Sequence, residues 1–187
     1  MRTAFRYIVT IVIGLILGAA LAVGTVRAGA LGSNVSIGPW ATGRDFGAAD
    51  ASPRTRAVVA LRGLLALPAR EARYYTAATD DAGRPLDGRC RYRVTGGALP
   101  GKWWSLTLYD RDGYLVRNEA GVFSVESAAV PEKPWTIAVA PTRRPGHWLP
   151  TGGLDHVELT LRTYLPPNGG RGDPPRAGLP SILKEGC

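Results

Sequence analysis

The sequence lacks the residue spacings by which most metal and nucleophile sites are recognised. It has only two cysteines and two histidines among 187 residues, and these form neither a C-x-x-C nor a Cys/His ligand spacing, so we expect no structural zinc site. Neither G-x-S-x-G nor H-E-x-x-H occurs, which removes the usual signatures of serine hydrolases and zinc peptidases. We therefore expect no metal and no cofactor.

Two other motifs are incomplete. Residues 96–102 match the first part of a phosphate-binding loop, but Trp103 stands where that loop requires Ser or Thr, and a strand pattern follows instead of a helix. Asp110 and Asp112 could form half of a calcium site, yet two acids in a tight turn usually bond the local backbone. Neither motif therefore indicates a ligand.

Acidic residues are scarce relative to basic ones. The chain has 23 Lys+Arg against 15 Asp+Glu, a formal net charge of +8. Arg2, Arg6 and Arg27 flank an N-terminal apolar segment, so the remaining 20 basic and 15 acidic residues leave +5 on the rest of the chain. This charge suits an anionic partner, either lipid head groups or an acidic glycan, and it equally suits a domain that is merely kept soluble. We expect no nucleic-acid partner.

The N-terminal segment, residues 7–26, contains no charged side chain. At about 1.5 Å per residue it spans about 30 Å as a helix, which matches the hydrocarbon core of a bilayer. Arg2 and Arg6 precede it, so the positive charge is expected to stay in the cytoplasm while the rest of the chain is exported. A signal peptide cleaved at Ala30 is the alternative, but the apolar run is longer than the usual 7 to about 15 residues.

These features divide the chain into three parts. We expect residues 1–28 to form a membrane anchor, residues 29–51 a linker that touches the domain through Trp40, and residues 52–187 the folded domain. The predicted localisation is the bacterial inner membrane, crossed once, with the C-terminal domain in the periplasm.

The two cysteines suit an oxidising compartment. Cys90 lies in RCRYRV, residues 89–94, whose alternation places three arginines on one face of a strand and Cys90, Tyr92 and Val94 on the other. Cys187 is the last residue. An even number of cysteines in an exported chain predicts one disulfide, between Cys90 and Cys187, although two unrelated thiols would leave the same sequence.

The densest aromatic and β-branched segment outside the N-terminus is GKWWSLTLYDRDGYLVRN, residues 101–118. Trp104, Leu106 and Leu108 alternate with polar and aromatic residues, which predicts a strand with one apolar face. Residues 110–113 have turn chemistry, and residues 114–116 are predicted to return as a second strand. We interpret the segment as a β-hairpin at the centre of the core.

The remaining patterns are typical of short strands joined by turns. Strands are expected at residues 73–77, 89–94, 123–125, 135–139 and 156–165, the last with Leu165 facing inward. Residues 54–66 are expected to form a helix that packs on the sheet, and residues 141–153 a loop. The predicted fold class is mainly β: a β-sandwich or jelly-roll-like domain with one packed helix, preceded by a single N-terminal transmembrane helix.

Polar side chains at strand ends and on outward faces form a candidate site. In a hydrolase that acts on a glycan or lipid, Asp110 would be the acid/base and Arg162 would hold an anionic group. The candidate ligand-binding residues are Tyr109, Asn118, Trp148 and Tyr164. We favour instead a domain that binds or scaffolds at the cell envelope without catalysis, because no catalytic signature is present.

Several short motifs resemble those of the bacterial "domain of unknown function 1214" family. They are LDGRCRY at 86–92, WWSLTLYD at 103–110, GYLV at 113–116 with Asn118, WLP at 148–150 and LRTYLP at 161–166. The resemblance implies a β-sandwich, jelly-roll-like domain, which in longer members is often fused to a second uncharacterised domain. This chain has a membrane segment instead, as in the shorter anchored members. His147 stands where the family tends to have Asn, and the family implies no established reaction.

Overall fold

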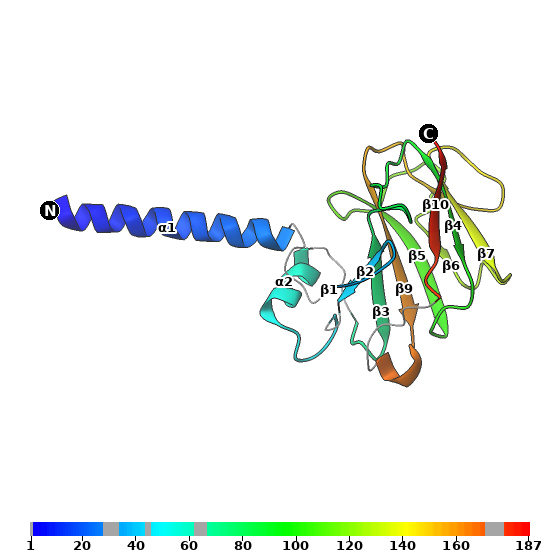
Figure 1. The fold of residues 1–187 in the computed structure, drawn as a ribbon, viewed down its shortest axis with the longest axis horizontal. Helices are drawn as coiled ribbons and strands as arrows, with labels where there is room; N and C mark the ends of the chain where they lie inside the picture. Colours follow the sequence, from blue (N-terminus) through cyan, green and yellow to red (C-terminus); the bar gives the residue numbers. More distant parts are fainter. Residues whose placement is uncertain (1, 28–33, 44–45, 62–66, 171–177) are drawn as a thin grey trace.

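A computed structural model shows two β-sheets packed face to face, preceded by a long N-terminal helix (Figure 1). The structure describes residues 2–27, 34–43, 46–61, 67–170 and 178–187. Its secondary structure is mainly β, and apart from the N-terminal helix it contains one short α-helix. The predicted fold class is therefore confirmed.

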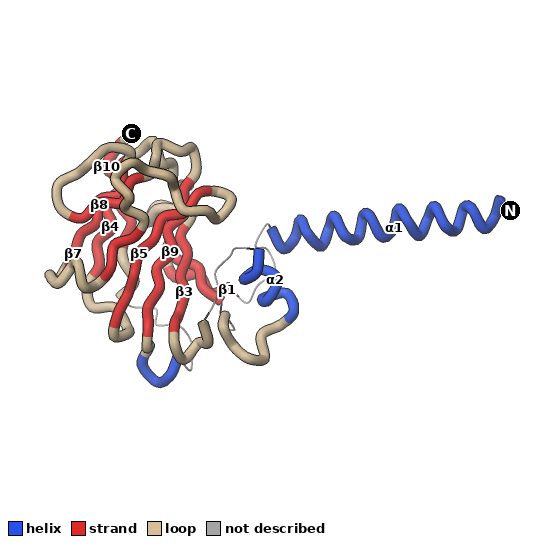
Figure 2. Tube along the Cα trace, turned by 180° about the vertical axis from the view of Figure 1, so that it is seen from behind, coloured by secondary structure: helices blue, strands red, loops and turns tan. Residues whose placement is uncertain are grey.

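The N-terminal helix α1 (Arg2–Arg27) contains the apolar segment. Its stretch from Thr3 to Thr25 is long and apolar enough to cross a membrane, and none of it is buried against the rest of the protein. Figures 1 and 2 show α1 extending away from the sheets. A signal sequence has the same length and composition, and the cleavage site considered at Ala30 lies outside the described residues, so retention of the anchor stays a prediction.

The larger sheet has six strands in the order β1-β2-β3-β9-β5-β6, and all of its neighbouring pairs are antiparallel. These strands are β1 (Asn34–Ile37), β2 (Trp40–Gly43), β3 (Ala72–Ala77), β9 (Val157–Tyr164), β5 (Trp103–Asp110) and β6 (Ser124–Glu126). The central strands β9 and β5 are the longest and pair along their full length, which makes them the rigid middle of the sheet.

The smaller sheet has four strands in the order β10-β4-β7-β8. They are β10 (Ser181–Gly186), β4 (Arg91–Gly96), β7 (Trp135–Ala140) and β8 (His147–Pro150). Only β7 and β8 run parallel. A disulfide between Cys90, just before β4, and Cys187, just after β10, joins the end of the chain to this sheet, as the sequence predicts.

The core fills the space between the two sheets, as the alternating patterns predict. Trp104, Leu106 and Leu108 of β5 are at most 7% exposed. The indole of Trp104 stacks on that of Trp135 from the opposite sheet, with ring centroids 4.6 Å apart. Aromatic pairs of this kind add about 0.5–1.5 kcal/mol to the burial of their surface. The two tryptophans therefore join the layers at one place.

The hairpin predicted at residues 101–118 is right in its turn and wrong in its second strand. The N–H of Gly113 donates to the carbonyl of Asp110 at 3.1 Å and closes the turn. Residues 114–116 form no strand, however; Leu115 makes only an isolated bridge with Tyr109. Strand β5 pairs along its whole length with β9, and on its other edge Ser105, Leu106 and Thr107 pair with β6, the next strand along the chain.

The expected linker, residues 29–51, contributes to the sheet. Within it, β1 and β2 form a hairpin, and β2 pairs with β3 through Ala41 and Thr76. Trp40 is 1% exposed, and its indole N–H donates to the carbonyl of Pro180 at 2.6 Å. The linker expectation therefore does not hold for residues 34–43, although the expected contact through Trp40 is present.

Two further expectations need correction. Residues 147–150, expected within a loop, form β8, because their four residues pair with β7. Leu165, expected to face the core, is 50% exposed with φ of 50°, because the chain leaves β9 there and the Leu165 N–H bonds the carbonyl of Glu71 at 2.8 Å.

The short helix α2 (Pro53–Leu61) starts where the sequence predicts. The Oγ of Ser52 accepts a hydrogen bond from the N–H of Thr55 at 3.1 Å, which is an N-terminal cap. The remainder of the predicted helix, residues 62–66, lies outside the described residues. Figures 1 and 2 show α2 beside the β1–β2 hairpin.

Candidate functional site

Arg162 lies on a central strand of the six-stranded sheet, on the face that points away from the core. It belongs to β9, whose inward residues Leu159 and Leu161 are fully buried, so the alternation of the strand directs Arg162 outward. Its register partners are Tyr74 on β3 and Ser105 on β5. Three strands therefore set the position of this arginine.

Hydrogen bonds and aromatic rings hold the guanidinium group of Arg162 in place. Nη2 donates to the hydroxyl of Tyr109 at 2.7 Å, and Nη1 donates to Oγ1 of Thr107 at 3.2 Å. The Cζ atom lies 5.5 Å from the ring centroid of Tyr109 and 5.8 Å from that of Tyr74. Both rings are within the range of a cation–π interaction.

An aromatic pair lies in the next row of the same face. Trp103 of β5 and Tyr164 of β9 are register partners, with ring centroids 4.8 Å apart and planes tilted by 60°. Both side chains are partly exposed. We call the surface formed by Tyr74, Trp103, Thr107, Tyr109, Arg162 and Tyr164 the Arg162 face.

Arg162 has more hydrogen-bond donors than its partners among the described residues use. A guanidinium group has five N–H donors, and two of those of Arg162 are bonded to the protein. Among the described residues, no carboxylate lies within ion-pair distance of it. A half-buried, positioned arginine with spare donors has the chemistry that recognises carboxylates and phosphates.

Tyr74 completes the face as a neutral hydroxyl. Burial raises its pKa above the usual value near 10, the hydrogen bond from the Leu67 N–H opposes this, and the neighbouring Tyr164 raises the pKa further against the charge of Arg162. Because the net shift is upward, Tyr74 is protonated at neutral pH. Its side chain is only 3% exposed, so its ring supports Arg162 and its hydroxyl is not presented to a ligand.

The carboxylate of the candidate acid/base Asp110 is hydrogen-bonded to the backbone of its own turn. Its Oδ1 accepts hydrogen bonds from the N–H groups of Asp112 at 3.0 Å and Tyr114 at 2.8 Å. Asp110 also follows Tyr109 directly in β5, and alternation turns the two side chains to opposite sides of the strand. The structure therefore gives Asp110 a structural task and does not bond it to Arg162.

Asn118 is likewise hydrogen-bonded to the backbone of its own loop. Its amide donates to the carbonyls of Val116 at 3.1 Å and Val122 at 2.9 Å, and its Oδ1 accepts from the Val122 N–H at 3.1 Å. All three bonds close the local loop. Of the predicted site residues, the structure thus brings Tyr109, Arg162 and Tyr164 onto one face, while Asp110 and Asn118 cap turns.

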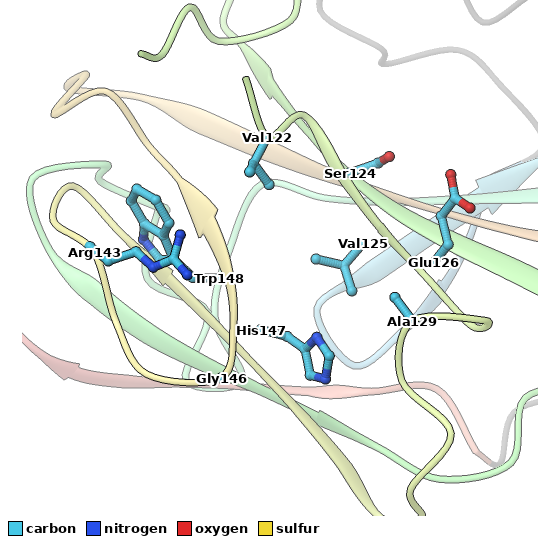
Figure 3. Close-up of a pocket in the computed structure, with 9 residues that line it drawn as sticks. All are labelled: Val122, Ser124, Val125, Glu126, Ala129, Arg143, Gly146, His147 and Trp148. Carbon is cyan, nitrogen blue, oxygen red and sulfur yellow. The ribbon is translucent and has the colours of Figure 1, made fainter. Parts of the chain in front are cut away.

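Trp148 lies apart from this face, at a surface pocket between the edge strands β6 and β8 (Figure 3). The pocket is open and has a volume of about 290 Å³. Its lining comprises Val122, Ser124, Val125, Glu126, Ala129, Arg143, Gly146, His147 and Trp148.

Most polar groups at this pocket already have partners. The indole N–H of Trp148 donates to the carbonyl of Ala140 at 3.0 Å, and the guanidinium of Arg143 lies 5.5 Å from the ring centroid of Trp148. Nε2 of His147 is 3.2 Å from a carboxylate oxygen of Glu132. These contacts stabilise the edge of the sandwich. Within the described part of the chain, no group of three or more His, Cys, Asp or Glu residues could hold a metal ion.

Sequence reasoning missed Tyr74 and Thr107 as members of the site. Alternation in the segment 72–77 separates Tyr74 from the buried Tyr75, and this signal was available. The pairing of β3 with β9 could not be predicted from the sequence, because the two strands are about 80 residues apart along the chain. Of the residues that line the pocket at β8, Trp148 was named from the sequence as a candidate, although it was expected in a loop and not in a strand.

Comparison with known proteins identifies the family of the domain. The sequence model of the family described as "Protein of unknown function (DUF1214)" matches residues 71–168. No protein of curated function matches the chain.

One solved structure with a similar fold and a second, weaker match are known. The VPA0106 protein from Vibrio parahaemolyticus has a TM-score of 0.54 and 22% sequence identity, over 72% of this chain and 36% of that protein. An uncharacterised protein from Burkholderia cenocepacia has a TM-score of 0.43 and 21% identity, over 61% of this chain and 29% of that protein. This chain thus spans about a third of the length of these solved proteins, and the first of them supports the fold alone.

Proposed function

We propose that this chain, which belongs to the DUF1214 family of proteins of unknown function, is a membrane-anchored, exported domain that binds a ligand at the cell envelope. Two features support the export. The helix α1 has the length and composition of a membrane span, and the Cys90–Cys187 disulfide is of the kind that persists in oxidising compartments. The positive charge before the apolar segment favours a periplasmic domain on the bacterial inner membrane.

One observation carries binding rather than catalysis. Arg162 is positioned by Tyr109 and Thr107 and has further N–H donors, whereas the carboxylate of Asp110 accepts hydrogen bonds from the backbone of its own turn. A hydrolase that used Asp110 as its acid/base would have to give up the hydrogen bonds that close this turn. The arrangement therefore supports recognition of an anionic group and gives no support to a glycan or lipid hydrolase.

The location is tested with full-length protein that has a C-terminal tag, expressed in a Gram-negative host. We expect the protein to stay in the membrane pellet through a high-salt wash, and protease added to spheroplasts to remove the tag while a cytoplasmic control protein survives. A tag that is protected in spheroplasts would contradict export. A soluble mature form that begins near Leu31 would show cleavage instead of anchoring.

A further inference from the structure

We propose that the Arg162 face binds an acidic saccharide, with a hexuronate carboxylate on Arg162 and a sugar ring against Trp103 and Tyr164. This proposal rests on the proposed function, because it names the ligand class of the same site.

The side chain of Arg162 is already positioned to bind a single carboxylate. Its contacts to Tyr109 and Thr107 fix the side chain, so little rotamer freedom remains to be lost when a ligand binds. The planar fork of a guanidinium group matches the two oxygens of a carboxylate. Because Tyr109 accepts its bond from Arg162, the hydroxyl proton of Tyr109 stays available to a ligand oxygen.

The aromatic pair favours a sugar over a lipid head group. Trp103 and Tyr164 lie one row from Arg162 on the same face, and neighbouring residues of one face are about 6.8 Å apart along a strand. A ring stacked on the pair would therefore adjoin the guanidinium. A phospholipid has the anionic group but no ring to stack on the pair.

An acidic neighbour restricts the ligand further. Glu126 is the register partner of Ser105, which is itself the partner of Arg162. Its exposed carboxylate places negative charge on the same face of the sheet. This charge disfavours a densely charged polyanion and tolerates a chain whose carboxylates are separated by sugar rings.

The test uses full-length wild-type protein in detergent micelles and a trisaccharide of galacturonic acid, followed by titration calorimetry and tryptophan fluorescence. The neutral probe is the methyl ester of the same trisaccharide. We expect saturable binding of the acid and at least tenfold weaker binding of the ester. This comparison needs no variant, so it does not depend on how any substitution folds.

Substitutions then locate the site. Arg162→Gln and Trp103→Ala are each expected to weaken binding at least tenfold, and Arg162→Lys, which keeps the charge but loses the fork, should be intermediate. The matched control is Arg143→Gln, since Arg143 also lies over an aromatic ring, that of Trp148, but at the pocket between β6 and β8. It should bind as the wild type does.

Several outcomes would overturn the proposal. They are no binding of the acid at millimolar concentration, equal binding of the ester, an equal loss with Arg143→Gln, or displacement of the sugar by vesicles that contain phosphatidylglycerol. None of these results would alter the protease and fractionation results, so failure of the saccharide proposal is distinguishable from failure of export and anchoring.

Discussion

At the scale of single residues, Asp87 links the stability of the domain to pH. Its carboxylate accepts hydrogen bonds from Nε and Nη2 of Arg89 at 2.9 and 2.6 Å and from the Arg89 N–H at 2.9 Å. The side-chain bonds of Arg89 contribute most, its N–H next, and together they lower the pKa of Asp87 to about 2. Because the ordinary value is about 3.9, the carboxylate binds its proton less readily in the folded state.

We predict that Asp87→Asn lowers the free energy of unfolding by about 1 kcal/mol at neutral pH, because one partner of this half-exposed pair loses its charge. The contribution of the native carboxylate is present above about pH 4 and is lost as the pH falls toward 2. Thermal unfolding of both proteins from pH 7 to pH 2 should therefore converge. Asp155→Asn is the control, since Asp155 is 72% exposed and 3.8 Å from Arg111. A difference that persists at pH 2 would contradict the linkage.

At the scale of elements, alternation of side chains predicted the long strands well and the short ones poorly. In β5 and β9 the period of two runs for eight residues and directs the leucines into the core. Burial itself does not alternate in the middle of these strands, because the outward Ser105, Thr107 and Thr160 are also buried. The short strand β8 follows Pro145 and ends at Pro150, and both prolines are turn signals; the strand exists because β7 offers it a parallel partner. Such pairing is a long-range effect that local composition does not contain.

The entry to β5 depends on a glycine. Gly101 has φ of 140°, and a Cβ atom there would lie 2.6 Å from the carbonyl oxygen of Tyr164. We predict that Gly101→Ala destabilises the protein by about 1–3 kcal/mol through backbone strain and this contact. Gly97→Ala in the same loop is the control, because nothing lies within 4 Å of its Cβ position, and it should leave urea denaturation unchanged or slightly improved. Equal effects of the two substitutions would show that the positive φ of Gly101 and its contact with Tyr164 do not determine the loss of stability.

The β1–β2 hairpin is fastened to the sandwich by Trp40. Its side chain is 1% exposed, and its N–H bonds the carbonyl of Pro180. We predict that Trp40→Ala costs about 3–5 kcal/mol through loss of packing, and that Trp40→Phe costs about 1–3 kcal/mol because the carbonyl of Pro180 loses its partner. Denaturation of the full-length protein in detergent measures both. A cost below 1 kcal/mol for Trp40→Ala would mean that the hairpin adds nothing to the fold.

At the scale of the whole molecule, the candidate site is assembled by strand register. Tyr109, Arg162 and Tyr164 could be named from the sequence because each lies outward on its own strand. Their meeting depends on the pairing of β5 with β9, and Tyr74 joins through β3. Asp110 and Asn118 were expected beside them because polar residues at strand ends often line sites. Their local hydrogen bonds instead close turns, which a sequence pattern does not distinguish from a catalytic task.

The disulfide closes the C-terminal half of the chain into a loop, because Cys90 and Cys187 are 97 residues apart. A cross-link that closes a loop of about 100 residues removes conformational entropy from the unfolded state, a stabilisation of about 4.7 kcal/mol in the chain-entropy model. We predict that Cys90→Ala/Cys187→Ala lowers the free energy of unfolding by roughly this amount.

Strand β10 should remain in place in that variant, because its backbone pairs with β4 from Ser181 to Gly186. The far-ultraviolet circular dichroism of the native state is then unchanged while the midpoint in urea falls. Wild-type protein treated with a phosphine reductant is the control and should unfold with the variant. Because the disulfide is expected to act mainly by restricting the unfolded chain, an altered native spectrum or an unchanged urea midpoint would show that it does not stabilise the protein in this way.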